Sequence, residues 1–233
     1  MSTSSSSSQA GGRQLSVRLK TARGRKTSSQ RWLQRQLNDP YVSKSREMGY
    51  RSRAAFKLLE INEKIKFLAP GKRVVDLGAA PGGWTQVAIE LVKPQLTGGY
   101  VLGLDIQEME PIAGATLLHL DFLQEDAEEI VIAAMGGKQA DVVLSDMAAF
   151  STGHAPTDHL KIMSLAETAF FFAQKVLSPG GTFLAKVLQG GTENTLLNQL
   201  KQSFKVVKHI KPPASRKDSS EMYVIALEFK GNK

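Results

Sequence analysis

The stretch that decides the fold runs from Val74 to Trp84 and reads V-V-D-L-G-A-A-P-G-G-W. Two β-branched residues lead into Asp76, as expected of a buried strand that ends near a carboxylate. Glycines and a proline follow at Gly78, Pro81, Gly82 and Gly83. Such a turn lets the backbone approach a ligand closely, and the N–H groups of a following helix face whatever lies in the turn. The pattern predicts a strand, a turn and a helix around a nucleotide-like ligand, although the literal G-x-G-x-x-G is absent.

Composition limits the class of protein. The chain has 233 residues, of which 42% are hydrophobic, enough for one globular core, and no apolar run is long enough for a transmembrane helix. Cysteine is absent, which excludes disulfides, thiolate metal sites and a cysteine nucleophile and fits a reducing compartment. The four histidines show no metal-ligand spacing, so we expect no metal site.

The net charge of +8 is concentrated at the N-terminus. Residues 1–53 are rich in Lys and Arg, and their only acids are Asp39 and Glu47, whereas the rest of the chain is close to neutral. This distribution is typical of a protein that binds a polyanion such as nucleic acid. The alternative is a tail that serves solubility alone.

We expect one domain behind a disordered tail. Residues 1–29 are rich in Ser, Gly, Thr and Arg and have few apolar residues, which predicts disorder. Their composition also resembles an organelle transit peptide, but no amphipathic helix is evident. Residues 30–233 should form a single domain whose N-terminal part, 30–68, is a basic helical extension.

Strand and helix patterns alternate through the rest of the chain. The expected strands are 73–77, 100–105, 116–120, 141–145, 182–188, 204–210 and 222–229, and the expected helices are 84–92, 125–134, 159–177 and 193–202. Strands that are apolar throughout indicate an α/β protein with a parallel sheet covered on both faces. The final helix and two strands indicate a terminal antiparallel hairpin on that sheet.

Aspartates recur where predicted strands end, at Asp76, Asp105, Asp121 and Asp146. In such sheets, ligands bind outside the carboxyl ends of the strands. One aspartate could simply cap the next helix, but four at one edge are hard to explain as caps, and they would repel a pyrophosphate. Asp105 follows Gly83 at about the spacing of an acid that accepts ribose hydroxyls. A nucleoside with positive charge fits better, and S-adenosylmethionine is the obvious candidate.

Five segments closely resemble the FtsJ/RrmJ family: R-S-R-A-A-F-K-L-L-E-I, V-V-D-L-G-A-A-P-G-G-W, L-S-D-M-A, F-L-A-K-V-L-Q-G and S-S-E-M-Y-V-I-A. Its members are S-adenosylmethionine-dependent ribose 2′-O-methyltransferases, and the bacterial one acts on the A-loop of 23S ribosomal RNA. The similarity runs from about Arg31 to the C-terminus. It implies a Rossmann-like methyltransferase fold, with a seven-stranded, mostly parallel sheet that has one antiparallel strand and helices on both faces.

The resemblance also implies the site residues. The catalytic Lys-Asp-Lys-Glu set of the family falls on Lys57, Asp146, Lys186 and Glu221. The implied cofactor-binding residues are Gly82, Trp84, Asp105, Asp121 and Asp146, with Asp105 near the ribose and Asp121 near the adenine. The chain departs from many relatives after D-M-A, where Ala149-Phe150 replaces Pro-Asn, so fine substrate contacts there remain open.

Methylation of a ribose hydroxyl requires that the hydroxyl lose its proton or be aimed at the methyl group. Lys186 lies within the apolar segment F-L-A-K-V-L, where a charged ammonium is disfavoured, and a nearby Lys57 would lower the pKa of Lys186 further towards a usable base. Asp146 and Glu221 would hold the two lysines. Without the resemblance, Lys57 could be an ordinary solvated helix residue.

Basic and aromatic residues suggest RNA contacts. Arg51 and Arg53 would contact phosphates beside Lys57, and a second basic group precedes Glu221 at Lys208, Lys211, Arg216 and Lys217. Tyr41, Tyr50 or Phe150 could stack on a flipped base or belong to the core.

The resemblance implies S-adenosyl-L-methionine as cofactor and 23S ribosomal RNA in the large ribosomal subunit as partner, for a cytoplasmic monomer with no membrane contact. Alternatives are the same chemistry on transfer RNA, a cap or mitochondrial large-subunit RNA. A nucleotide-dependent oxidoreductase is weakened by the strand-end acids, and a non-catalytic RNA-binding or ribosome-assembly factor by the intact Lys-Asp-Lys-Glu set.

Overall fold

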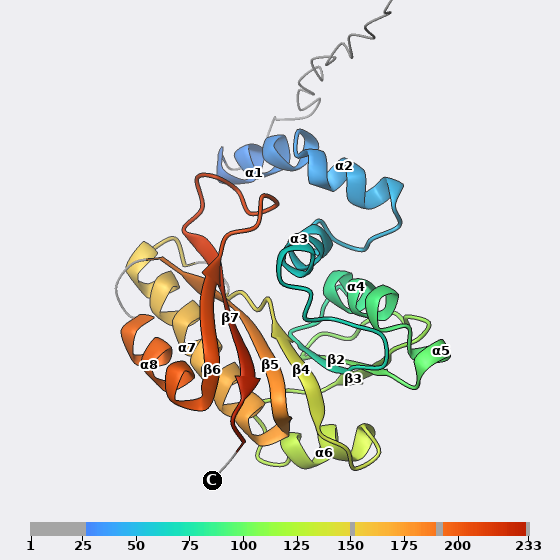
Figure 1. Ribbon diagram of the computed structural model, residues 1–233. Helices are drawn as coiled ribbons and strands as arrows, with labels where there is room; N and C mark the ends of the chain where they lie inside the picture. The colour runs from blue at the N-terminus through green and yellow to red at the C-terminus, as the bar shows by residue number, and fades with distance from the viewer. Residues whose placement is uncertain (1–26, 150–151, 190–192, 232–233) are drawn as a thin grey trace, which may run out of the picture.

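One seven-stranded sheet forms the centre of the molecule in the computed structural model, which describes residues 27–149, 152–189 and 193–231 (Figure 1). The strands are β1 (Arg73–Leu77), β2 (Tyr100–Asp105), β3 (Thr116–His119), β4 (Ala140–Ser145), β5 (Leu177–Leu188), β6 (Phe204–Ile210) and β7 (Glu221–Phe229). Their order across the sheet is β3-β2-β1-β4-β5-β7-β6. Neighbours pair in parallel except β7, which runs antiparallel to both β5 and β6. The predicted sheet, with one antiparallel strand and a terminal hairpin, is confirmed.

The chain reverses its direction of progress across the sheet between β1 and β4. It leaves β1 for β2 and β3 on one side, then returns to lay β4 against the other side of β1. Leu77 at the end of β1 pairs with Ser145 at the end of β4, so the two carboxyl ends are adjacent. Ligands of open α/β sheets bind in the crevice at such a reversal.

Helices cover both faces of the sheet because successive residues of each strand point to opposite sides. Val74 packs into a core with α3 (Ala55–Ile65) and α4 (Gly83–Val92). Its neighbour Val75 packs into a second core with α6 (Ala127–Ala134), α7 (Ala155–Val176) and α8 (Glu193–Ser203) (Figure 1). The short helix α5 (Pro94–Thr97) was not predicted. Within the described ranges, no helix combines the length and apolar character needed to cross a membrane.

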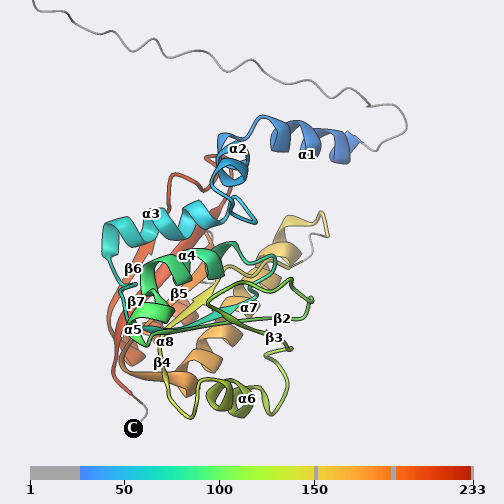
Figure 2. The same ribbon diagram turned by 90° about the vertical axis from the view of Figure 1, so that its right-hand side faces the viewer.

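The predicted basic extension, residues 30–68, contains three helices: α1 (Thr27–Leu37), α2 (Pro40–Glu47) and α3. Of these, α1 and α2 continue beyond α3 on the side away from α6 (Figure 2). Asp39 caps α2 by accepting the Tyr41 N–H at 3.1 Å, and Pro40 occupies the first turn, where no N–H is required. The extension begins at Thr27, slightly before the expected boundary at residue 30. The rest of the tail expected to be disordered, residues 1–26, lies outside the described residues.

The junction of α7 and β5 differs from the prediction. The predicted helix 159–177 starts earlier, at Ala155, because Pro156 is tolerated in a first helical turn. The segment Ser178-Pro179-Gly180-Gly181 was expected to separate helix and strand, but β5 begins at Leu177. Leu177 pairs with Ala140 and Thr182 with Val142, so the four residues between them form an irregular, bulged part of the strand.

Candidate active site

The structure brings together the four predicted catalytic residues, which come from four separate elements: Lys57 from α3, Asp146 from the end of β4, Lys186 from β5 and Glu221 from β7. Lys57 Nζ lies 2.9 Å from Glu221 Oε1 and 3.6 Å from Asp146 Oδ2. Lys186 Nζ lies 3.2 Å from Asp146 Oδ1 and donates a 2.8 Å hydrogen bond to the Asp146 carbonyl. Carboxylates and ammonium groups therefore alternate in the order Glu221, Lys57, Asp146, Lys186.

The antiparallel pairing of β5 with β7 explains half of this cluster. Lys186 is the register partner of Tyr223, and Leu188 is the partner of Glu221. Lys186, Tyr223 and Glu221 therefore project from the same face of the sheet, the face that α3 covers with Lys57. The side chains of Lys57 and Lys186 are only 9% and 7% exposed. Such buried ammonium groups need their carboxylate partners.

Tyr223 is a member of this cluster that the sequence reasoning missed. Its hydroxyl donates a 2.7 Å hydrogen bond to Asp146 Oδ1 and lies 3.4 Å from Glu221 Oε1. Its ring centroid lies 5.7 Å from that of Trp84 and 5.7 Å from Lys57 Nζ. Burial, followed by the charges of Asp146 and Glu221, raises the pKa of Tyr223 well above its usual value, so the hydroxyl stays a donor. The one available signal was its position two residues after Glu221 in a strand.

Asp146 is ionised at the centre of the cluster. Burial raises the pKa of this carboxyl group, but the Lys186 and Lys57 ammonium groups and the Tyr223 hydroxyl lower it by more, and the net pKa lies below its usual value. A single carboxylate thus serves two lysines. Removal of the Asp146 carboxylate would leave the buried Lys186 ammonium without its carboxylate partner, which is strongly destabilising.

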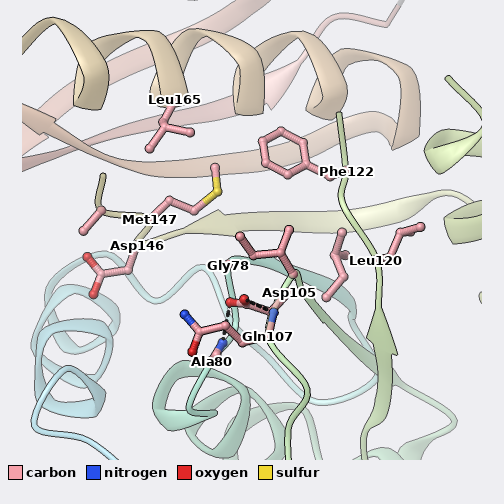
Figure 3. A pocket seen from close by; sticks show the side chains of 12 residues that line it. Gly78, Ala80, Asp105, Gln107, Leu120, Phe122, Asp146, Met147 and Leu165 are labelled. Atoms are coloured by element: carbon pink, nitrogen blue, oxygen red, sulfur yellow. Dashed lines mark hydrogen bonds between the residues drawn. The ribbon is translucent and has the colours of Figure 1, made fainter. Parts of the chain in front are cut away.

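A cavity of about 300 Å³ opens beside the cluster at the carboxyl ends of β1, β2 and β4 (Figure 3). Asp146 lies at one side of it and Leu120 with Phe122 at the other, with Asp105 between them. Met147 and Leu165 complete an apolar wall. The cavity has the size and the mixed lining of a nucleoside site, and Asp146 belongs to both the cavity and the cluster.

The Asp105 carboxylate is fixed by backbone donors on both of its oxygens. Oδ2 accepts the Ala80 N–H at 2.9 Å and Oδ1 accepts the Gln107 N–H at 2.8 Å (Figure 3). Each carboxylate oxygen has a second acceptor site, so Asp105 retains capacity for the two hydroxyls of a ribose. A Cβ on Gly78 would lie 2.3 Å from Met147 Cγ, so only glycine leaves the cavity its present shape.

Three of the predicted cofactor residues are not among the described residues that line this cavity. Gly82, with φ of 111°, caps α4 in the glycine turn. Trp84 is buried, and its Nε1 donates to the Ala54 carbonyl at 2.8 Å. Asp121 stands between two lining residues and accepts the Leu123 N–H at 3.0 Å. Cofactor contacts by Gly82, Trp84 and Asp121 stay predictions.

Asp76 lies under the glycine turn and is 1% exposed. The Thr85 hydroxyl donates to Asp76 Oδ2 at 2.7 Å. Burial raises the pKa of Asp76 to about 7, the Thr85 hydrogen bond opposes this, and the charges of Asp146 and Asp105 add to it. Asp76, Asp105 and Asp146 therefore lie close enough to interact, as expected of the acids at the strand ends, and Asp76 is the buried one of the three.

Arg51 and Arg53 make intramolecular contacts in the structure. The Arg51 guanidinium donates to three backbone carbonyls, those of Glu110 at 2.7 Å, Pro111 at 2.8 Å and Pro81 at 3.3 Å. Arg53 Nε lies 2.9 Å from Asp39 Oδ2. Arg51 thus joins the glycine turn to the loop after β2, and its predicted phosphate contact competes with these bonds.

The aromatic residues considered for base stacking are tied to the body of the protein. The Tyr41 hydroxyl donates to Glu60 at 2.8 Å and the Tyr50 hydroxyl to Glu90 at 2.6 Å. Phe150 lies outside the described residues. The described ranges also contain no cluster of side chains suited to hold a metal ion.

The strand order and the crevice at β1 and β4 are those of a Rossmann-like sheet, and the match to a methyltransferase family model makes it a methyltransferase that uses S-adenosylmethionine. The family model of FtsJ-like methyltransferases matches residues 50–229. The chain belongs to this family.

Known relatives agree with this assignment. The chain is 63% identical over 228 residues to the ribosomal RNA large subunit methyltransferase E of Parvibaculum lavamentivorans, covering 95% of this chain and 89% of that protein. It is 60% identical over 225 residues to the protein of the same name from Paramagnetospirillum magneticum, covering 95% and 91%. A crystal structure described as a ribosomal RNA methyltransferase from Plasmodium falciparum superposes with a TM-score of 0.70 and 29% identity, covering 78% of this chain and 100% of that one.

Proposed function

We propose that this protein transfers a methyl group to a ribose 2′-hydroxyl of 23S ribosomal RNA in the large ribosomal subunit. The observation that carries the proposal is the alternating cluster of Lys57, Asp146, Lys186 and Glu221, which shares Asp146 with the cavity at the carboxyl ends of β1, β2 and β4. The choice of RNA is supported by relatives of 56–63% identity that bear the name ribosomal RNA large subunit methyltransferase E.

The lining of the cavity suggests how S-adenosylmethionine is oriented. Asp105 would accept the ribose hydroxyls, and the apolar side chains near Leu120 and Phe122 would contact the adenine, with Asp121 close by. Asp146 would face the positively charged end, since its carboxylate is ionised. When bound, the cofactor supplies an electrophilic methyl group. Gly82 and Trp84 would shape the turn behind it.

We assign Lys186 the role of proton acceptor. Its Nζ is held by the side chain and carbonyl of Asp146, the residue that the cavity and the cluster share. In its neutral form the amine has one lone pair, which would accept the proton of the 2′-hydroxyl as the hydroxyl oxygen attacks the methyl group. Asp146 would keep Lys186 in position.

Lys57 and Glu221 would orient the acceptor ribose from the opposite side of the cluster. Their 2.9 Å ion pair is fixed further by Ser215, whose hydroxyl donates to Glu221 Oε1 at 2.8 Å. A fixed ammonium group can donate to the 2′-oxygen and hold it in line with the methyl group. Positioning of two reactants in this way supplies a large part of many enzymatic rate enhancements.

A binding protein without catalytic activity is the less favoured candidate. Burial of two lysines and two carboxylates has a large desolvation cost, which the ion pairs only partly repay. A protein that merely binds RNA has no need of this arrangement. Within the enzymatic proposal, the finer expectation is a uridine of the A-loop as acceptor and a cytoplasmic monomer as the active form.

The decisive experiment offers tritiated S-adenosylmethionine with free 23S RNA, assembled large subunits and transfer RNA, and maps any label. We expect label on one ribose of 23S RNA, where a 2′-O-methyl group protects the following linkage from alkali. Label on a base would refute the reaction type, and label on transfer RNA alone would refute the substrate.

A matched pair of lysine variants tests the assignment of the site. Lys186→Ala should bind cofactor normally and lose turnover. Lys175→Ala removes a lysine that pairs with Glu128 on the surface, and it should behave as the wild type. Full turnover by Lys186→Ala would remove Lys186 from its proposed role.

A further inference from the structure

A second cavity of about 280 Å³ adjoins the catalytic cluster at Glu221. Its lining residues are Arg35, Arg53, Arg216, Asp218, Ser219 and Glu221. They come from α1, from the turn before α3, and from β7 and the loop that precedes it. In Figure 1 this loop between β6 and β7 extends towards α1. Three segments that are distant in sequence thus converge on one polar cavity beside the proposed acceptor site.

Asp39 fixes two of the arginines. Its side chain is 8% exposed, and its Oδ2 lies 2.9 Å from Arg53 Nε and 3.3 Å from Arg216 Nη2. Arg53 Nη2 also donates to the Ala214 carbonyl at 2.6 Å. A guanidinium has five N–H donors, so these contacts leave both arginines with donors for a ligand. One carboxylate thus holds two guanidinium groups in a preorganised arrangement for binding an anion.

The loop that carries Arg216 is itself anchored. Lys211 Nζ donates to the Ser219 carbonyl at 2.6 Å, and the Ala214 N–H donates to Glu60 Oε2 on α3 at 2.6 Å. The cavity wall is therefore connected to the body of the domain by several hydrogen bonds. Its shape does not depend on surface side chains alone.

The charge balance favours a single negative charge. The lining residues and their direct ion-pair partners include four cations, Arg35, Arg53, Arg216 and Lys57, and three carboxylates, Asp39, Asp218 and Glu221. The excess is one positive charge, which one phosphodiester would neutralise. The planar guanidinium fork also matches the oxygen geometry of a phosphate.

We propose that this cavity binds one backbone phosphodiester of the RNA next to the acceptor ribose, and that Asp39 is a positioning residue that holds Arg53 and Arg216 for it. The inference rests on the proposed function, because it takes the substrate to be RNA and the acceptor to lie at Lys57 and Lys186. It assigns the phosphate contact to Arg53 and Arg216. Arg51 instead keeps its hydrogen bonds to three backbone carbonyls.

The first test measures RNA binding without turnover, with S-adenosylhomocysteine present and a 23S fragment as probe. Arg216→Gln should bind the fragment about tenfold more weakly, and the slope of log K against log salt should fall by about one. Its affinity for cofactor should stay within about twofold of wild type, because Arg216 does not line the cofactor cavity. Lys205→Gln, which removes the same charge from the exposed surface of β6 and lies outside the predicted RNA-contacting group, should change binding far less. Equal effects of the two variants would overturn the proposal.

In Asp39→Asn, the direction of the change in RNA affinity distinguishes a positioning role of Asp39 from a purely electrostatic effect. The substitution removes a negative charge beside the cavity, so electrostatics alone predicts tighter RNA binding. If Asp39 positions the arginines, binding weakens instead, and Asp39→Asn adds little in an Arg216→Gln background. Asparagine retains the helix cap of α2, and a thermal melt checks that the fold is preserved. Tighter binding by Asp39→Asn would overturn its positioning role.

Neutral methylphosphonate linkages identify the phosphate. Substitution at one of the two linkages that flank the acceptor, on its 5′ or its 3′ side but not on both, should weaken binding to the wild type. The same substitution should have little effect on binding to Arg216→Gln. If substitution at both linkages weakened RNA binding equally in both proteins, a site for a single phosphate would be contradicted. Normal 23S ribose methylation by an Arg216→Gln enzyme with unchanged RNA affinity refutes this inference alone. If the variants bind RNA as predicted but the wild-type protein transfers no methyl group to it, the proposed function is refuted and this inference is not.

Discussion

The hydroxyl of Tyr223 donates a 2.7 Å hydrogen bond to Asp146 Oδ1, the same oxygen that lies 3.2 Å from Lys186 Nζ. The ring of Tyr223 packs against Trp84 in the helix that follows the glycine turn. Tyr223 therefore connects the first turn of α4 with the carboxylate that holds the proposed base. Its contribution is positional, because its raised pKa keeps it protonated.

Tyr223→Phe should lower kcat about tenfold, since a hydrogen bond to a charged group is worth roughly 1.5–3 kcal/mol. The ring remains, so cofactor affinity should change less than about twofold. The measurement is single-turnover methylation together with cofactor titration. Tyr100→Phe removes a hydroxyl that bonds Thr116, away from the cluster, and serves as the control. A normal rate for Tyr223→Phe would show that Asp146 needs no such support.

Gly78→Ala should damage the cofactor site specifically. Gly78 has φ of 70°, and an added Cβ would lie 2.3 Å from Met147 Cγ in the cavity wall. Gly136 has a similar φ of 68° with nothing near its Cβ position, so Gly136→Ala carries the backbone strain without the clash. Gly136→Ala should lose about 1 kcal/mol of stability from the strain alone, and Gly78→Ala should lose more because of the clash. Only Gly78→Ala should also weaken cofactor binding, by about tenfold or more. Equal cofactor affinities in the two variants would contradict this reading of the cavity.

Local patterns in the sequence were sufficient to predict the sheet. Val74, Val75 and Leu77 form a short apolar run that ends in glycines, and such runs alternated with helical patterns along the chain. The bulge after Leu177 was not predictable in this way, because it depends on the pairing with Ala140 and Val142. Pairing register is a property of the assembled sheet.

The site was only partly accessible from local sequence. Lys57 was assigned through the family resemblance, since on its helix it looks like a solvated residue. Tyr223 reads as an ordinary core aromatic in a strand. Arg51 looked like a phosphate contact because the three carbonyls that bind it come from other parts of the chain. Each case depends on tertiary contacts that no local pattern encodes.

Asp76→Asn should change the pH dependence of stability. The pKa of Asp76 is raised from 3.8 to about 7 in the folded protein. The folded state therefore binds more protons than the unfolded state between these values, so the contribution of Asp76 to stability falls as pH rises from about 4 to about 7. Asparagine removes this loss and can still accept the Thr85 hydrogen bond. The advantage of the variant over wild type should therefore be larger at pH 8 than at pH 5, by roughly 2–3 kcal/mol.

Urea unfolding at the two pH values measures this difference. Asp126→Asn exchanges an exposed aspartate at the start of α6, whose side chain makes no cap hydrogen bond, and is the matched control. The same stability difference between wild type and Asp76→Asn at pH 5 and pH 8 would show that Asp76 does not titrate in this range.

Arg51→Gln should weaken cofactor binding more than RNA binding. Arg51 joins Pro81 in the glycine turn to Glu110 and Pro111 in the loop after β2, the loop whose first residues line the cofactor cavity. Without this link the two rims of the cavity lose their fixed separation, and we expect cofactor Kd to rise about tenfold, while kcat at saturation changes little. Arg51→Lys should not restore affinity, because one ammonium group cannot reproduce the planar fork that reaches three carbonyls.

Arg46→Gln, on α2, controls for the loss of one positive charge. Isothermal titration with cofactor and with RNA distinguishes the two roles: a loss confined to RNA affinity would mean that Arg51 contacts phosphate after all, and that the carbonyl contacts yield when RNA binds.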